Sequence, residues 1–190
     1  MTEFRHLAIA GVIEVTPSRF GDHRGHFSET YSRYAFEEAG IALDWVQDNQ
    51  SFSAQVGTVR GLHFQAPPVA QAKLVRVLRG AVFDVAVDIR KGSPTYGAWV
   101  GIELSAEKGN QLLVPMGFAH CFMTLKPDTE VFYKVSDRYS KEHEGSIRWN
   151  DPDLGIDWPS LNEEPTLSDK DREAPMFADL ASPFKSTAIE

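Results

Sequence analysis

The chain has 190 residues, of which 42% are hydrophobic and 24% are charged, a balance typical of a globular protein rather than a disordered or fibrous one. Its formal net charge of −8 argues against a nucleic-acid partner, because nonspecific binding to nucleic acid depends on a dominantly basic surface. The single cysteine, Cys121, excludes an intrachain disulfide and favours a reducing, cytoplasmic setting, and no apolar run predicts a secretory signal or a membrane partner.

The first predicted elements are a charged segment at residues 20–31 and a short helix. The segment FGDHRGHFSETY taken alone is typical of a solvated loop, but Arg24 can bind a phosphate through paired hydrogen bonds and Glu29 can accept one from a base or a sugar. In the following SRYAFEEAG, Ser32 suits the start of a helix and Gly40 suits its end. This helix is too short to change the fold class.

Short strand-like runs separated by turn residues follow from about residue 47. VQDNQS supplies Gln47, Asp48 and Asn49, which suit either the reading of a nucleobase edge or the capping of a turn. KLVRVLRGAVFDVAVDIRKGSP contains two β-branched runs joined at an Arg-Gly turn, and residues 98–140 continue the pattern. Short strands at regular spacing predict a mainly β sandwich or barrel with short peripheral helices.

Beyond about residue 151 the chain is rich in Pro, Asp, Glu and Ser. We expect this segment to be irregular chain and short helix wrapped onto the β core, fraying after about Pro183. Its predicted apolar anchors are Trp158, Leu161, Leu167 and Phe177. We predict a single domain over residues 1–190, because a chain of this length can bury one substantial core.

Strand alternation places four polar side chains on inward faces, because residues two apart share a face. The strand VRGLHFQ puts His63 on the same side as Val59, and the strands KLVRV, AHCFMTL and EVFYKVS turn Lys73, His120 and Tyr133 inward. An inward histidine or tyrosine can simply be a hydrogen-bonded core residue. A lysine needs an anionic partner, which a phosphate, a carboxylate or a developing enolate would supply.

The pattern around His63 argues against a metal centre. Jelly-roll barrels that bind iron, manganese or zinc present two closely spaced histidines, a carboxylate and a further histidine, because three or four ligands must converge on the ion. Here Phe64 and Gln65 follow His63, and no second histidine is adjacent. We therefore expect no metal ion at this position.

Several segments of the chain, taken in order, resemble those of a known protein family. They are FGDHRGHFSETY, VQDNQS, VRGLHFQ, QAKLVRVLRGAVFDVAVDIRKGSPTYGAWVGIELS, LLVPMGFAHCFMTL, VFYKVSDRYS and EGSIRWNDPDLGIDWP. Together, from about Arg5 to Pro175, they closely resemble the dTDP-4-dehydrorhamnose 3,5-epimerase family. The resemblance implies a cupin-type jelly roll, a homodimer, and chemistry without metal or nicotinamide. It also implies epimerisation of dTDP-4-dehydro-6-deoxy-D-glucose at C3 and C5 to dTDP-4-dehydro-L-rhamnose, a step in L-rhamnose biosynthesis.

The same resemblance implies roles for individual residues. His63 in RGLHFQ matches the general base, Asp171 in LSDKD matches its carboxylate partner, and Tyr133 in VFYK matches the proton donor on the opposite side. Lys73 in QAKLVR matches the residue beside the C4 oxygen. The matches to substrate-binding positions are Arg60 and His120 at the sugar and phosphate end, Arg24, Glu29, Gln47, Asp48 and Asn49 at the nucleotide, Tyr139 at the thymine ring, and Glu144 and Lys170.

This chemistry is consistent with the residue types. A proton beside a ketone becomes removable when the charge developing on the ketone oxygen is stabilised, for which Lys73 is suited. Histidine is an effective base near neutral pH, and pairing with Asp171 would hold its tautomer and stabilise the imidazolium. Inversion needs reprotonation from the other face, so a second group such as Tyr133 is required.

Two points stay open at the level of sequence. Simple alternation puts Arg60 on the face opposite His63, so either Gly61 marks a bulge, or Arg60 acts from a strand end or across a dimer interface. Asp169 and Asp171 both flank Lys170. The family motif favours Asp171 as the histidine partner, but both carboxylates remain candidates.

Three alternative functions also remain. An enzyme that inverts only C3 or only C5 of a related dTDP-4-keto-6-deoxy sugar would keep the same base and ketone-binding residues. A cupin-like module could hold a nucleotide sugar without turning it over. A metal-dependent cupin enzyme would require stoichiometric metal in the purified protein.

Overall fold

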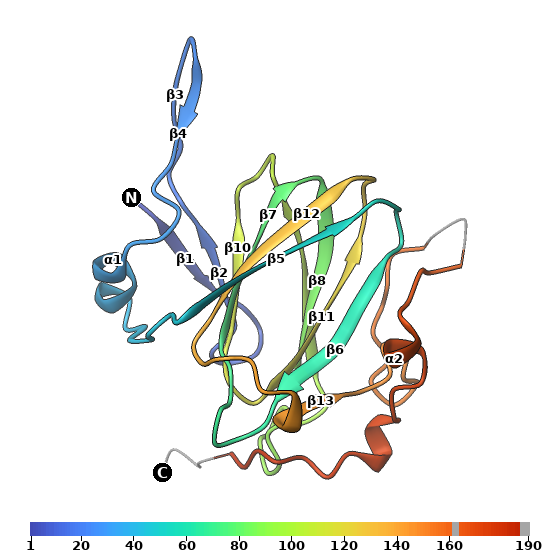
Figure 1. The fold of residues 1–190 in the computed structure, drawn as a ribbon. Helices are drawn as coiled ribbons and strands as arrows, with labels where there is room; N and C mark the ends of the chain where they lie inside the picture. The colour runs from blue at the N-terminus through green and yellow to red at the C-terminus, as the bar shows by residue number, and fades with distance from the viewer. Residues whose placement is uncertain (161–163, 187–190) are drawn as a thin grey trace.

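The structure, a computed structural model, describes residues 1–160 and 164–186 and consists of two antiparallel sheets facing each other, with a hairpin projecting from them (Figure 1). In spatial order, the six-stranded sheet contains β1 (Glu3–His6), β2 (Ile13–Thr16), β10 (Gln111–Val114), β7 (Lys73–Arg79), β12 (Thr129–Val135) and β5 (Gln47–Ser53). The five-stranded sheet contains β13 (Glu144–Ser146), β6 (Val59–Gln65), β11 (Phe118–Thr124), β8 (Ala81–Asp88) and β9 (Trp99–Ser105). The projecting hairpin is formed by β3 (Phe20–Asp22) and β4 (Gly25–Phe27). This arrangement confirms the predicted mainly β class.

The helices are short and peripheral, as predicted. They are α1 (Arg33–Glu38), α2 (Asp169–Arg172) and the 3-10 helices η1 (Lys141–His143) and η2 (Phe177–Asp179). Ser32 does stand at the start of α1, although its side chain makes no capping hydrogen bond there. Within the described residues, every helix is too short or too polar to cross a bilayer.

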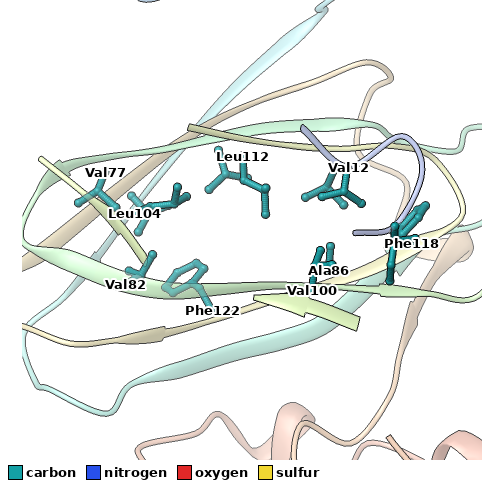
Figure 2. Packing of buried hydrophobic residues seen from close by; sticks show 13 residues of the cluster. Val12, Val77, Val82, Ala86, Val100, Leu104, Leu112, Phe118 and Phe122 are labelled. Carbon is teal, nitrogen blue, oxygen red and sulfur yellow. The ribbon is translucent and has the colours of Figure 1, made fainter. Parts of the chain in front are cut away.

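An apolar core fills part of the space between the two sheets (Figure 2). Val77 and Leu112 of the six-stranded sheet point toward Val82 and Phe122 of the five-stranded sheet, and none of these side chains is more than 4% exposed. Burial of side chains of this size stabilises the fold by about 1.5–3 kcal/mol each. Tyr133 packs against this cluster, so the core borders the polar part of the same interior.

The C-terminal segment covers the outer face of the five-stranded sheet. The predicted anchors Trp158, Leu167 and Phe177 pack against a second buried cluster that includes Val85 of β8, whereas Leu161 lies outside the described residues. Strand β8 is thereby buried on both faces, which accounts for its nearly continuous apolar sequence.

The expected fraying after Pro183 is wrong for the residues that follow it directly. Phe184 is 8% exposed, and its ring meets that of Phe64 edge-on at 6.1 Å. The backbone N–H of Lys91 donates to the carbonyl of Phe184, and Lys185 forms a parallel bridge with Lys91. Apolar burial and backbone pairing therefore hold this end of the chain against the sheet.

Strand β6 contains a bulge that changes which side chains face the interior. His63 pairs with His120 of β11 whereas Arg60 pairs with Phe122, so β6 has one residue more than β11 between these pairs. The side chain of Val59 consequently packs in the outer cluster, although the residue also borders the interior cavity, whereas Arg60 and His63 both line that cavity and neither belongs to the cluster. The prediction that Val59 and His63 share a face is wrong, because simple alternation stops at the bulge.

Gly61 makes this bulge possible. Its φ is +127°, a conformation that side chains other than glycine rarely adopt, and a Cβ built there would collide with the carbonyl oxygen of His120 and lie 2.7 Å from Cα of Cys121. Only glycine therefore lets β6 approach β11 this closely.

Replacing Gly61 with alanine should lower the free energy of unfolding by about 3 kcal/mol, because the unfavourable φ and the collision add. Gly25 is a matched control, since its φ is +135° but nothing lies within 4 Å of a Cβ built there. Gly25→Ala should cost only about 1 kcal/mol. Urea denaturation of the two variants measures the difference, and equal losses would contradict the close-approach explanation.

Candidate active site

A cavity of about 440 Å³ between the two sheets collects the four polar residues predicted to face inward. His63 and His120 reach it from β6 and β11 of the five-stranded sheet, and Lys73 and Tyr133 reach it from β7 and β12 of the six-stranded sheet. An occupant would therefore meet the histidines and the tyrosine from different sides. The remaining lining residues are Ser51, Thr58, Val59, Arg60, Phe122, Thr166, Leu167, Ser168, Lys170 and Asp171.

His63 is paired with Asp171 of α2. The ring Nε2 of His63 lies 2.5 Å from Oδ1 of Asp171, whose side chain is almost completely buried. Because an ionised carboxylate can only accept, the proton of a neutral His63 sits on Nε2 and the lone pair of Nδ1 is left free. The structure thus selects Asp171 over the exposed Asp169 as the partner, and it leaves His63 able to take a proton.

Asp171 is held in its ionised form by its neighbours. Burial alone raises the pKa of this carboxyl, but the hydrogen bonds from His63 and Ser168 and the charge of Lys170 outweigh burial and lower the pKa. A negative Asp171 stabilises positive charge on the imidazole of His63. The pair therefore has the properties of a general base with a charge-stabilising partner.

The other side of the cavity contains a desolvated cation. Burial lowers the pKa of Lys73 to about 8, although the negative charges of Asp84 and Glu144 oppose the shift. Lys73 thus retains its proton at neutral pH and presents a half-buried ammonium to the cavity. Such a group interacts strongly with a developing negative charge.

A second histidine–carboxylate pair lies next to Lys73. His120 is 7% exposed, and its Nε2 lies 2.8 Å from Oδ1 of the fully buried Asp84. Burial lowers the pKa of His120, and Asp84 only partly offsets this, so the ring is neutral and donates its Nε2 proton to the carboxylate. The Nδ1 atom of His120 then remains available to accept a hydrogen bond.

Tyr133 of β12 presents a phenol to the cavity from the six-stranded sheet. Burial raises the pKa of its phenol, the charge of Arg60 opposes this, and Glu144 adds to it. The phenol therefore keeps its proton at and above neutral pH. Tyr133 is positioned by β12, where it pairs with Val75 of β7 on one side and with Asn49 of β5 on the other.

A smaller cavity of about 130 Å³ adjoins the first, and His63, Lys73 and Tyr133 line both. Four of the residues predicted to bind the nucleotide or nearby groups line this second space: Gln47, Asn49, Tyr139 and Glu144. The two cavities together bring most of the predicted binding residues to the predicted catalytic ones.

Glu144 connects the two cavities. One of its carboxylate oxygens lies 2.6 Å from Nζ of Lys170, and the other accepts a hydrogen bond of 3.1 Å from the hydroxyl of Tyr139. Burial raises the pKa of Glu144, but these two partners outweigh it and lower the pKa. Lys170 on α2 and the exposed ring of Tyr139 are thereby held at the rim of the site.

Three predicted binding residues line neither of these two cavities. Asp48 points to the opposite face of β5 and pairs at 3.0 Å with Lys134. Arg24 lies on the projecting hairpin and pairs at 2.6 Å with Asp22, and Glu29 follows that hairpin and is exposed. The structure does not bring these side chains to His63.

Several residues of the site were not identified from the sequence. Asp84 was not predicted because β8 is buried on both faces. The alternation of side chains along this strand therefore does not show which of them point into the interior between the sheets. Ser51 shares a face with Gln47 and Asn49, and alternation along β5 would have found it.

Among the described residues, no three His, Cys, Asp or Glu side chains are grouped so that they could hold a metal ion.

Comparison with known proteins extends this description. A family model described as dTDP-4-dehydrorhamnose 3,5-epimerase matches residues 6–179. A protein of that name from Sinorhizobium fredii is 54% identical over 186 residues, covering 98% of this chain and 95% of the relative.

Solved structures agree with the sequence comparison. The dTDP-6-deoxy-D-glucose-3,5-epimerase of Legionella pneumophila, solved with dTDP-4-keto-L-rhamnose, superposes with a TM-score of 0.94 at 43% identity and covers 99% of this chain and 100% of that one. A 3'-monoepimerase from Streptomyces bikiniensis, solved with dTDP-quinovose, has a TM-score of 0.85 at 37% identity over 92% of this chain and 87% of its own. The chain therefore belongs to the dTDP-4-dehydrorhamnose 3,5-epimerase family.

Proposed function

We propose that this protein epimerises dTDP-4-dehydro-6-deoxy-D-glucose at C3 and C5 and so produces dTDP-4-dehydro-L-rhamnose. The observation that carries the proposal is the placement of a paired histidine base and a neutral tyrosine acid on opposite sheets, with a half-buried lysine from the tyrosine's sheet lining the same cavity. Removal and return of a proton beside a ketone need these three functions.

The first step is proton abstraction by His63. Its free Nδ1 takes the proton from the carbon beside the C4 ketone, the C–H electron pair forms the carbon–carbon double bond of an enolate, and the ketone oxygen gains the negative charge. Asp171 stabilises the resulting imidazolium. Lys73 stabilises the enolate oxygen, and the Nδ1 of His120 accepts a hydrogen bond from a sugar hydroxyl.

The second step is reprotonation from the other face. Tyr133 comes from the six-stranded sheet and donates its phenolic proton to the same carbon, so the enolate collapses to the ketone with inverted configuration. The neighbouring Arg60 favours the transient phenolate, since its charge opposes the burial that raises the pKa of Tyr133. Solvent then takes the proton from the His63 imidazolium and returns one to the Tyr133 phenolate, and the same cycle at the second carbon completes the double inversion.

The double epimerase is favoured over a single one by sequence similarity. The chain is 54% identical to a relative named as a 3,5-epimerase and 37% identical to the 3'-monoepimerase. The folds superpose well in both classes, so the backbone alone does not distinguish them. The stereochemical outcome at each carbon is therefore the decisive observable.

We propose that the nucleotide lies toward the smaller cavity and that a second copy of the chain completes its site. Gln47, Asn49 and Tyr139 line that cavity, whereas Arg24 lies on a hairpin that projects away from the barrel (Figure 1). The hairpin carries Phe20 and Phe27, 63% and 71% exposed, as a surface for a partner. In a homodimer, the hairpin of one protomer would bring Arg24 to the phosphates, and Glu29 to the nucleotide, in the partner's site.

The proposed setting is the cytoplasm, with a dTDP-sugar as the small-molecule partner and no nucleic-acid or membrane partner. This rests on the single, buried Cys121 and on the net charge of −8.

Incubation with dTDP-4-dehydro-6-deoxy-D-glucose in deuterated water tests the main proposal. We expect NMR and mass spectrometry to find deuterium at both C3 and C5, with inverted configuration at each. His63→Ala should lower the exchange rate by about 10²- to 10⁴-fold while substrate still binds. Label at one carbon would instead indicate a monoepimerase, and binding without any label would indicate a non-catalytic module.

The pH dependence tests the role of Lys73. Because its pKa is lowered to about 8, the ammonium is lost as pH rises above 8, and kcat/KM should fall about tenfold per pH unit there. The pKa of Tyr133 is raised, so its phenol keeps its proton through this range. Lys73→Arg keeps its charge and should be slower overall but without the descending limb up to about pH 10. If the descending limb of the pH profile is unchanged in Lys73→Arg, the limb reports the titration of another group.

Complementation between protomers tests the shared site. Arg24→Ala should weaken substrate binding about 100-fold through the lost phosphate contact, and His63→Ala removes the base. A heterodimer of the two variants, isolated with two affinity tags, contains one intact site and should recover about half of the wild-type activity. If Arg24 instead acts in its own chain's site, the heterodimer will show no recovery.

A further inference from the structure

We infer that Ser168 is a positioning residue for the reaction, acting through Asp171 to fix the carboxylate against His63. The inference rests on the proposed epimerase activity and adds a residue to its proton-transfer machinery. The hydroxyl of Ser168 lies 2.9 Å from Oδ2 of Asp171, while Oδ1 of the same carboxylate lies 2.5 Å from Nε2 of His63. Each carboxylate oxygen thus has its own partner.

The direction of the Ser168 hydrogen bond follows from counting protons. The backbone N–H of Asp171 donates to Oγ of Ser168 at 3.2 Å, so this oxygen already acts as an acceptor. Its one hydroxyl proton therefore goes to Oδ2 of Asp171, which can only accept when it is ionised. Ser168 therefore makes two hydrogen bonds with Asp171. It accepts one from the backbone N–H and donates the other to the carboxylate, so it fixes both groups of Asp171.

This arrangement matters because Asp171 sits on a very short helix. Helix α2 spans only Asp169–Arg172, which is too short to hold its own geometry without outside contacts. Two hydrogen bonds hold the chain just before it to the start of β6 and the residues that precede that strand: the N–H of Val59 donates to the carbonyl of Thr166, and the N–H of Thr166 donates to the carbonyl of Gly57. Ser168 continues this attachment to the carboxylate itself.

Without the Ser168 hydroxyl, the carboxylate can rotate about its last torsion and lose alignment with the imidazole. The effect should appear in the proton-transfer step, in which His63 becomes positively charged, and not in the binding of the neutral ketone. Ser168 also lines the cavity, so direct contact with substrate is the competing explanation. The two explanations differ in which kinetic parameter changes.

Four variants separate these effects. Ser168→Ala should lower kcat about tenfold and leave KM within about twofold. Ser168→Thr retains the hydroxyl and should restore most of kcat. Ser168→Asp places a second carboxylate against that of Asp171, so like-charge repulsion should lower kcat at least as far as in Ser168→Ala and should also lower Tm. Ser32→Ala is the control, because Ser32 begins α1 without a side-chain capping bond and should leave kcat unchanged.

A double-mutant cycle completes the test. In an Asp171→Ala background, Ser168→Ala should cause no further loss of the deuterium-exchange rate, because the group through which Ser168 acts is gone. An equal further loss, a rise in KM without a fall in kcat, or full activity of Ser168→Asp would each overturn the inference. If the unmodified protein exchanges no deuterium at all, the proposed function fails instead; if it exchanges normally and Ser168→Ala matches it, only the role of Ser168 fails.

Discussion

The pairing of His63 with Asp171 is the constraint on which the rest of the site depends. It joins a barrel strand to a short helix 108 residues later in the chain, and it places a carboxylate in a nearly water-free position. Such a carboxylate must be held by hydrogen bonds and positive charge, or its burial is strongly unfavourable. The C-terminal segment must therefore be packed against the five-stranded sheet before the proposed base has its partner. The apolar contacts of that segment thus serve the chemistry directly, although they lie on the outside of the barrel.

The interior between the sheets combines two incompatible demands. One part is an apolar core whose burial stabilises the fold, and the adjoining part holds Lys73, His120 and Asp84, each of which is costly to desolvate. The lowered pKa values of Lys73 and His120 are direct consequences of that cost. Oδ2 of Asp84 has no hydrogen-bond partner among the described residues, which adds to it. A protein selected for stability alone would fill this space with aliphatic side chains, so the polar cluster indicates that function has been retained at the expense of stability.

The features of the fold and of the site that could be predicted from the sequence are those that depend on residues close together in the chain. The strands, the short helices and the inward direction of Lys73, His120 and Tyr133 follow from alternation and turn residues, and the structure agrees with them. The family resemblance was confirmed by comparison. The position of Arg60 could not be predicted, because a glycine such as Gly61 is compatible with a bulge, a turn or a plain strand. The choice of Asp171 over Asp169 needed the packing of the tail, and the distance of Arg24 from the cavity needed the course of the hairpin.

The features that sequence periodicity missed are also the ones that assemble the site. Regular alternation along β6 would have turned Arg60 out of the cavity that contains His63, and the extra residue in the bulge turns both inward. A regular continuation of the barrel would likewise have supplied no carboxylate for His63, and an irregular tail with a one-turn helix supplies it. Periodic sequence builds the two sheets that separate the proposed base from the proposed acid. The departures from periodicity then bring the charged groups into the cavity between the two sheets. A glycine without a side chain and a tail with little secondary structure are therefore as necessary to the proposed chemistry as the residues that transfer protons.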